Sequence, residues 1–276
     1  MRIAFSKMQG LGNDFVVINC VTQSYEPTPE QCRILSNRRF GIGCDQILLV
    51  QPSPHSAIDF YYRIFNQDGS EAEQCGNGAR CIASFIHKQG LSGAQEITVG
   101  TRSGPIHLFL ESATQVRVNM GIPRFQPAEI PFLAEQVSIK YTLMVDNTAF
   151  EIGVVSMGNP HAVLQVPQLK LEQVRNLGPR IESHSRFPNK VNVGFMHIVD
   201  SSHINLQVYE RGAGETLACG TGACAAMAIG RNQGLLNETV IVTQPGGDLN
   251  INWEGEGFSL WMTGPAIWVF DGEIEI

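Results

Sequence analysis

The sequence predicts an α+β protein built from two pseudo-symmetric domains, each a β-sheet or barrel wrapped around a central α-helix. The motif Cys-Gly-x-Gly-Ala occurs twice, at residues 75–79 and 219–223, so its two cysteines are 144 positions apart (219 − 75). Strand-forming segments dominate the rest of both halves, and each motif leads into small and apolar residues at helical spacing. Because a duplication repeats a whole structural unit, we expect both halves to share one architecture.

The duplication extends beyond the cysteine motif. The same offset aligns Glu71 with Glu215 and the tripeptide Gln-Gly-Leu at 89–91 with its copy at 233–235. A second alignment, at an offset of 146 (158 − 12), matches residues 12–17 with residues 158–163. The join lies near residues 120–123, and the segment after Gly264 returns to the first half. We therefore expect one domain at 1–120 plus 264–276 and the other at 121–263.

Strands and helices are expected in the same order in both halves. Apolar and β-branched runs separated by Gly, Pro, Asn and Asp predict strands in the first half at 15–18, 46–50, 60–65, 106–110 and 116–120, and in the second half at 162–166, 195–199, 204–209, 240–242 and 260–262. Helices are expected at 81–86 and 223–229, ending at Gly90 and Gly234 as C-terminal caps. The helix at 223–229 is apolar nearly all round, so the sheet must enclose it.

Composition indicates a mildly acidic globular protein that binds a small molecule. The chain has 276 residues, 43% of them hydrophobic and 16% charged, with a formal net charge of −7. Its basic residues are scattered and its pI is near 5.5, which opposes attraction to nucleic acid. We therefore expect no nucleic-acid partner.

The chain is expected to be cytoplasmic and not associated with a membrane. The first residues, 1–8, lack the apolar core of a secretory signal, and no apolar run approaches the roughly 18 residues that span a bilayer. The seven cysteines are an odd number, and Cys20, Cys32 and Cys44 have no disulfide-like spacing. These three are expected to be free, buried thiols in a reducing compartment.

The two motif cysteines are the candidate catalytic groups. Cys75 and Cys219 each precede a predicted helix, where unpaired amides and the positive end of the helix dipole are expected to lower the thiol pKa. The glycines of the motif leave those amides open to an anion such as a carboxylate. Two sulfurs on opposite faces of one carbon would suit inversion: one removes the proton next to the carboxylate and the other returns one.

Zinc binding and disulfide formation are the two alternative uses of these cysteines. Zinc could be bound by Cys75 with Cys81 and by Cys219 with Cys224, but five and four intervening residues miss the usual ligand spacing and no histidine is near in sequence. A disulfide between Cys75 and Cys219 could act as a redox switch. For Cys81 and Cys224, inside apolar helices, packing is the preferred interpretation.

Seven motifs together carry a resemblance to a known family. They read MQGLGNDF, NQDGSE, CGNGARC, MGNPH, YERGAGET, ACGTG and MTGPA, at residues 8–15, 66–71, 75–81, 157–161, 209–216, 218–222 and 262–266. In order and spacing the chain resembles the diaminopimelate epimerase family. The resemblance implies PLP-independent conversion of LL- into meso-2,6-diaminopimelate, which supplies lysine and, in many bacteria, peptidoglycan precursors. It implies no metal and no organic cofactor.

The resemblance also implies roles for particular residues. Cys75 and Cys219 would form a thiolate and thiol pair whose roles exchange with reaction direction, and His161 and Glu210 would tune them. Glu210 would also engage the reacting amino group and Arg211 the distal carboxylate. The remaining substrate-binding residues would be the loop amides of Gly76, Asn77, Gly220 and Thr221, and the side chains of Asn13, Gln46, Asn66, Asn159 and Asn192. An amide can bind either an ammonium or a carboxylate without adding charge near the thiols.

A homodimer is the family expectation. Phe270 stands where some members have a tyrosine associated with dimer packing, and an aromatic ring of similar size can fill the same contact.

Two rival functions remain open at this point. A proline or hydroxyproline racemase of the same fold would also use paired cysteines, but its substrate lacks the second zwitterionic end that Glu210, Arg211 and the asparagines favour. A thiol redox or zinc-binding module would instead contain a metal or a stable disulfide in its active form.

Overall fold

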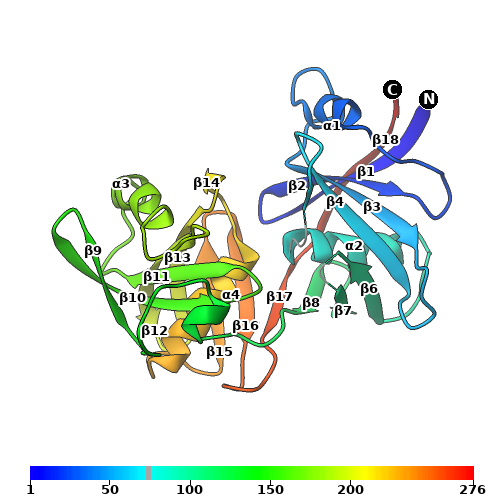
Figure 1. Cartoon of the computed structure of the whole chain (residues 1–276). Coiled ribbons are helices and arrows are strands. Elements are labelled where there is room, and N and C mark those ends of the chain that lie inside the picture. Colours follow the sequence, from blue (N-terminus) through cyan, green and yellow to red (C-terminus); the bar gives the residue numbers. More distant parts are fainter. Residues whose placement is uncertain (73–75, 103) are drawn as a thin grey trace. The chain divides into compact units, whose positions relative to one another are not determined.

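The computed structural model describes residues 1–72, 76–102 and 104–276 (Figure 1). It divides into two compact units, Met1–Asn119 with Thr263–Ile276, and Met120–Met262. None of the helices formed by the described residues is long and apolar enough to cross a membrane.

The described residues of the first unit form helices α1 and α2, strands β1 to β8 and the C-terminal strand β18. Its elements are β1 (Arg2–Gly10), β2 (Asn13–Asn19), α1 (Pro29–Ser36), β3 (Gln46–Pro52), β4 (Phe60–Asn66), β5 (Glu71–Ala72), α2 (Gly76–Lys88), β6 (Glu96–Thr101), β7 (Gly104–Leu110), β8 (Gln115–Asn119) and β18 (Ile267–Glu275). The last strand, β18, pairs antiparallel with β1, so the C-terminal segment completes the sheet of the first unit.

The second unit repeats this order of elements. It comprises the 3-10 turn η1 (Pro127–Glu129), β9 (Tyr141–Val145), β10 (Thr148–Ser156), β11 (Pro160–Gln165), α3 (Leu171–Glu182), β12 (Asn192–Asp200), β13 (His203–Glu210), β14 (Gly214–Glu215), α4 (Gly220–Asn232), β15 (Thr239–Gln244) and β16 (Gly247–Asn252). Strand β17 (Trp261–Pro265) contains the point where the chain leaves this unit.

Strand pairing repeats between the units down to the register. The series β1-β2-β3-β4-β6-β7 pairs antiparallel, parallel, antiparallel, parallel, antiparallel, and the series β10-β11-β12-β13-β15-β16 does the same. Phe15 pairs with Gln46 in one unit, and His161 pairs with Asn192 in the other, each partner shifted by 146 positions (161 − 15 and 192 − 46). The expected α+β fold with two similar halves is confirmed.

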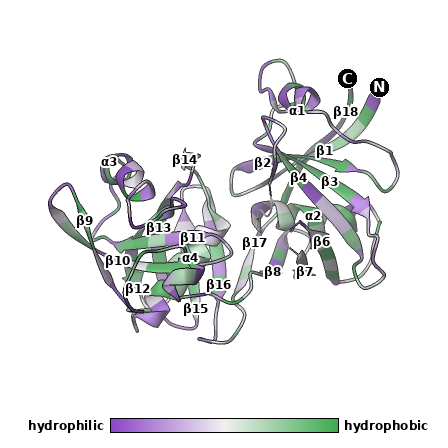
Figure 2. Cartoon of the chain, in the orientation of Figure 1, coloured by the Kyte–Doolittle hydropathy of each residue, from purple (hydrophilic) through white to green (hydrophobic). Residues whose placement is uncertain are grey.

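Each unit encloses one apolar helix. Residues Gly76–Ile86 of α2 are buried, and α2 contacts β1, β2, β3, β7 and β8. In α4 the run from Gly222 to Gly230 is buried against β10–β13, β15 and β16. Figure 2 shows more hydrophilic colouring on α1 and α3, which lie outside these enclosed positions. The two central helices were predicted, whereas α1 and α3 were not.

Glycine ends both central helices as the sequence predicts. Gly90 and Gly234 have φ of 67° and 71°, a left-handed conformation that costs glycine little. The residue after each glycine donates its amide five positions back, Leu91 to Ile86 and Leu235 to Gly230. This closes the last turn and directs the chain into the next strand.

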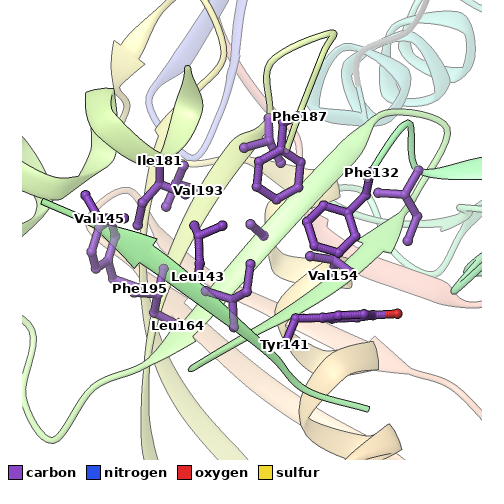
Figure 3. Packing of buried hydrophobic residues seen from close by; sticks show 14 of the residues in the cluster. Phe132, Tyr141, Leu143, Val145, Val154, Leu164, Ile181, Phe187, Val193 and Phe195 are labelled. Atoms are coloured by element: carbon purple, nitrogen blue, oxygen red, sulfur yellow. The ribbon is translucent and has the colours of Figure 1, made fainter. Parts of the chain in front are cut away.

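The core of the second unit fixes α3 against the sheet. Ile181 of α3 belongs to a buried cluster with Val193, Phe195 and Leu143 from the strands (Figure 3). The Phe132 ring packs edge-on against Tyr141, with ring centroids 4.9 Å apart. Burial of this apolar surface holds the C-terminal end of α3 in place.

Replacement of Gly178 by alanine should destabilise the second unit. A Cβ at Gly178 would lie 2.6 Å from Cγ of Tyr209, so α3 or the ring would have to move. Overpacking of this kind costs about 1–3 kcal/mol, which outweighs the roughly 1 kcal/mol that alanine gains over glycine in a helix. Urea unfolding should show a lower midpoint for Gly178→Ala. The exposed Asn176→Ala on the same helix is the control, and equal midpoints for the two variants would contradict this packing argument.

Candidate active site

In the first unit, three predicted site residues meet at one edge of the sheet. Asn13 begins β2, Gln46 begins β3 and Asn66 ends β4. Because β2 runs parallel to β3 and β3 antiparallel to β4, these three ends coincide. The Gln46 Nε2 donates to Asn66 Oδ1 at 2.9 Å.

The first turn of α2 joins this group. Asn77 Nδ2 donates to Asn13 Oδ1 at 3.2 Å, and Arg80 Nη2 donates to Asn77 Oδ1 at 3.0 Å. The fully buried Arg80 also donates from Nε to the carbonyl oxygen of Pro265 at 3.1 Å. Gly76 and Asn77 are buried at the start of the helix, while Cys75, which directly precedes them, lies outside the described residues. The Arg80 contact with Oδ1 orients the Asn77 side chain.

A network of charged side chains holds the Asn13 side chain in place. Asp45 Oδ2 accepts from Asn13 Nδ2 at 3.0 Å, and Asp45 Oδ1 accepts from Arg38 at 2.8 Å. Arg38 also donates to both oxygens of Asp14, and Asp14 Oδ2 accepts in addition from the buried Lys7. Burial acts to raise the pKa of Asp14, but hydrogen bonds from Arg38 and Lys7 lower it well below its usual value. Asp14 is therefore ionised, and sequence motifs alone did not reveal this network.

In the second unit, Cys219 is the N-cap residue of α4. Its side chain is buried, its Sγ lies 3.6 Å from Thr221 Oγ1, and its backbone amide donates to Gln244 Oε1 at 2.8 Å. Gln244 comes from β15 and was not predicted as part of the site.

The pKa of Cys219 is raised, contrary to the expectation for a thiol at a helix N-terminus. Burial is the largest cause, followed by the negative charge of Glu210. The Thr221 hydroxyl and the Gly222 amide act in the opposite direction but do not prevail. The desolvation of a sulfur at the end of an enclosed helix outweighs the amides, so Cys219 is a neutral thiol at neutral pH.

Glu210 ends β13 beside this thiol. Its carboxylate accepts from Thr216 Oγ1 at 2.6 Å and from the Cys219 thiol. Burial raises the pKa of Glu210, and the hydrogen bonds from Thr216 and Cys219 partly oppose that rise. Glu210 and Cys219 therefore share a buried environment in which the charge of Glu210 opposes ionisation of the thiol, while the thiol stabilises the carboxylate by donating to it.

A hydrogen-bonded chain leads from His161 to the same sulfur. His161 Nε2 lies 3.0 Å from Asn159 Oδ1, Asn159 Nδ2 donates to Thr221 Oγ1 at 3.3 Å, and Thr221 contacts the sulfur. Since Oδ1 can only accept, the His161 ring carries its proton on Nε2. Burial, followed by the charge of Arg211, lowers the pKa of His161 to about 3, so the ring is neutral.

Asn192 and Arg211 complete the predicted group of the second unit. Asn192 Nδ2 donates to the carbonyl oxygen of Pro160 at 3.0 Å, and its Oδ1 accepts from the Arg211 amide at 2.9 Å. The Arg211 guanidinium donates from Nη1 to the carbonyl oxygen of Asn189 at 3.1 Å. The amide of Asn192 thus holds the backbone that carries Arg211.

The predicted residues form two clusters at equivalent positions of the duplication. Asn13, Gln46, Asn66, Gly76 and Asn77 belong to the first unit, and Asn159, His161, Asn192, Glu210, Arg211, Cys219, Gly220 and Thr221 belong to the second. Asn13 aligns with Asn159 and Gln46 with Asn192 at an offset of 146 (159 − 13 and 192 − 46), and Asn66 aligns with Glu210 at 144 (210 − 66).

The buried neutral His161 should make the free energy of unfolding fall as the pH is lowered. Its folded pKa of about 3 lies below the unfolded value of 6.5, so its contribution is present above pH 6.5 and is lost as the pH falls toward 3. Between these values the wild type should lose up to about 1.4 kcal/mol of unfolding free energy per pH unit more than His161→Gln. Urea unfolding of both proteins at pH 7.5, 6.0 and 5.0 tests this. Parallel pH dependences would show that the ring is charged in the folded state.

Comparison with solved structures shows that other proteins share this fold. A hydroxyproline epimerase from Agrobacterium vitis matches with a TM-score of 0.71 at 14% identity, covering 99% of this chain and 92% of that one. A phenazine biosynthesis protein of the PhzF family from Bacillus anthracis matches with a TM-score of 0.69 at 17% identity, covering 100% of both chains. At these identities the likeness concerns the fold alone.

Comparison of sequences identifies the family. The family model described as diaminopimelate epimerase matches residues 5–126 and 153–269. A diaminopimelate epimerase from Thioalkalivibrio sulfidiphilus is 58% identical over 100% of both chains, and one from Nitrosospira multiformis is 55% identical over 100% of this chain and 99% of its own. The chain belongs to the diaminopimelate epimerase family and is an isomerase.

Proposed function

We propose that this protein converts LL-2,6-diaminopimelate into meso-2,6-diaminopimelate by a two-base mechanism that uses Cys75 and Cys219 and no PLP. The observation that carries the proposal is the second-unit cluster: a neutral thiol at the N-terminus of an enclosed helix, next to Glu210 and Thr221. Membership of the diaminopimelate epimerase family supports the substrate. The two compact units are proposed to be the two halves of the epimerase.

In the proposed reaction the resting enzyme has Cys219 as the thiol and Cys75 as the thiolate. The Cys75 thiolate removes the α-proton from one face, and the electron pair of the C–H bond stays on carbon and its carboxylate. The Cys219 thiol then gives its proton to the opposite face. The products are the inverted stereocentre, a Cys75 thiol and a Cys219 thiolate, and the reverse reaction exchanges the roles.

The environment of Cys219 suits a group that must both give and regain a proton. Burial and Glu210 keep the proton on sulfur at rest. When the proton leaves, the Thr221 hydroxyl and the Gly222 amide stabilise the new thiolate. His161 would act through Asn159 and Thr221 as a neutral hydrogen-bond donor, because its lowered pKa keeps it uncharged.

The helix N-termini supply the proposed carboxylate cradle. The amides of Gly76 and Asn77 begin α2, and those of Gly220 and Thr221 begin α4. Such amides and the helix dipole favour the charge that develops on the reacting carboxylate. Glu210 would bind the reacting ammonium and Arg211 the distal carboxylate, with the side chains of Asn13, Gln46, Asn66, Asn159 and Asn192 completing recognition.

A homodimer in the cytoplasm is also proposed. On β18, Val269 and Phe270 are exposed apolar residues, and the Phe270 ring packs edge-on against Phe5 with centroids 6.0 Å apart. An exposed aromatic and aliphatic pair of this kind favours a protein contact. Sedimentation of the wild type and of Phe270→Ser tests the dimer, since the variant should dissociate at a higher concentration.

Removal of either motif cysteine should abolish epimerisation. In deuterium oxide the wild type should incorporate solvent deuterium at the α-carbon of diaminopimelate, and Cys75→Ala and Cys219→Ala should each stop inversion. Cys224→Ala, a buried thiol of α4 given no role in the chemistry, is the matched control. Turnover in either motif variant would exclude the two-thiol mechanism, and incorporation into proline in preference to diaminopimelate would favour the racemase alternative.

Alkylation should separate the reactive thiol from the buried ones. Burial raises the pKa of Cys32 to about 11 and that of Cys44 to about 12, and Cys20, which is only partly buried, also reaches about 11. Iodoacetamide at pH 7.5 should therefore label Cys75 before these thiols and before Cys219, because thiolates react and thiols do not. Mass-spectrometric mapping with and without diaminopimelate measures this. Labelling of Cys219 first would reverse the proposed resting state.

A further inference from the structure

We propose that Glu182 is a positioning residue that fixes the turn carrying Arg211 and so aligns its guanidinium with the distal carboxylate of the substrate. This inference rests on the role proposed above for Arg211. Neither Glu182 nor its helix α3 appeared among the residues that the sequence motifs single out.

Glu182 is a buried carboxylate at the end of a firmly packed helix. Its residue surface is 7% exposed, and the preceding Ile181 belongs to the apolar cluster that packs α3 on the sheet (Figure 3). A carboxylate in such a place needs hydrogen-bond donors to offset its lost hydration. Glu182 finds one in the backbone amide of Gly212, which donates to Oε1 at 2.9 Å.

The turn after β13 depends on contacts from outside its own hairpin. Three successive amides are satisfied in different ways: Arg211 donates to Asn192 Oδ1 at 2.9 Å, Gly212 donates to Glu182 Oε1 at 2.9 Å, and Ala213 donates to the Glu210 carbonyl at 3.2 Å. Two of the three acceptors are side chains, so the turn geometry depends on Asn192 and Glu182.

Glu182 also contacts the segment on which the Arg211 guanidinium rests. The Lys190 Nζ lies 3.4 Å from Glu182 Oε1, and the Val191 amide donates to the Glu182 carbonyl at 3.1 Å. The adjacent Asn189 carbonyl accepts from Arg211 Nη1 at 3.1 Å. One residue therefore ties together the backbone that carries Arg211 and the segment that receives its guanidinium.

The acceptor oxygen, more than the negative charge, is expected to matter. The Lys190 side chain is 55% exposed and its contact is long, so the ion pair contributes little. The Gly212 bond is shorter and part-buried. Loss of a hydrogen bond to a charged acceptor corresponds to about a tenfold or larger loss in an equilibrium.

The experiment compares three substitutions at Glu182 by α-deuterium exchange of diaminopimelate. Glu182→Gln keeps an acceptor oxygen at the same reach, Glu182→Asp keeps the charge but withdraws the oxygen, and Glu182→Leu removes both. We expect a KM within about threefold of wild type for Gln, and about tenfold or more above it for Asp and Leu, with kcat changed less than KM. Lys190→Met should raise KM less than twofold, and Glu172→Gln, an exposed carboxylate on the same helix, should match wild type.

The outcomes separate this inference from the proposed function. If the wild type exchanges deuterium normally while Glu182→Asp and Glu182→Leu leave KM unchanged, the role proposed for Glu182 is refuted. The epimerase mechanism then stands. If Asp rescues KM and Gln does not, the charge pair with Lys190 is the operative contact, which also overturns the inference. Should Glu182→Leu fail to fold, the comparison of KM between Glu182→Gln and Glu182→Asp still tests the inference. A wild type that exchanges no deuterium would instead refute the proposed function.

Discussion

The site depends on one physical constraint: a titratable sulfur at the amino end of a helix that the sheet encloses. Enclosure removes water from Cys219, which raises its pKa, while the amide of Gly222 and the hydroxyl of Thr221 stabilise the ionised form. Glycines permit this enclosure: Gly153 of β10 lets Ile229 of α4 approach, and Gly230 of α4 lets Leu236 approach, where a Cβ would collide. The apolar packing of the helix therefore also sets the pKa of the thiol at its first turn.

The duplication provides two such helix ends but gives them different surroundings. Glu210 in the second unit aligns with Asn66 in the first, and His161 aligns with Phe15. A carboxylate beside Cys219 opposes its ionisation, whereas an amide at the equivalent position adds no charge. A two-base inversion needs one sulfur with a proton and one without. In the proposed mechanism, substitutions at matching positions of a repeated scaffold supply that difference.

The sequence predicted those features that are encoded locally or by the repeat. Gly90 and Gly234 mark their helix ends because glycine adopts a left-handed conformation at little cost, and the repeated motif predicts one central helix in each half. The predicted starts at 81 and 223 are late, because the helices begin at Gly76 and Gly220. It did not reveal Glu182 or Gln244, whose partners lie 30 and 25 residues away in the chain. It also gave the wrong direction for the pKa of Cys219, since the helix end is visible in the motif but the depth of burial is not.

Both units support their polar site residues with buried or half-buried carboxylates that do not belong to the recognised motifs. In the first unit Asp45 accepts from Asn13 and is neutralised by Arg38; in the second, Glu182 accepts from Gly212 and lies near Lys190. A carboxylate oxygen accepts the N–H of its partner, so it restrains the geometry of that partner. The nearby cation limits the field that each carboxylate exerts at a distance. In the proposed mechanism, neutral asparagines face the substrate while charged groups of each unit hold their geometry, and the Cys219 sulfur responds mainly to burial and to its immediate neighbours.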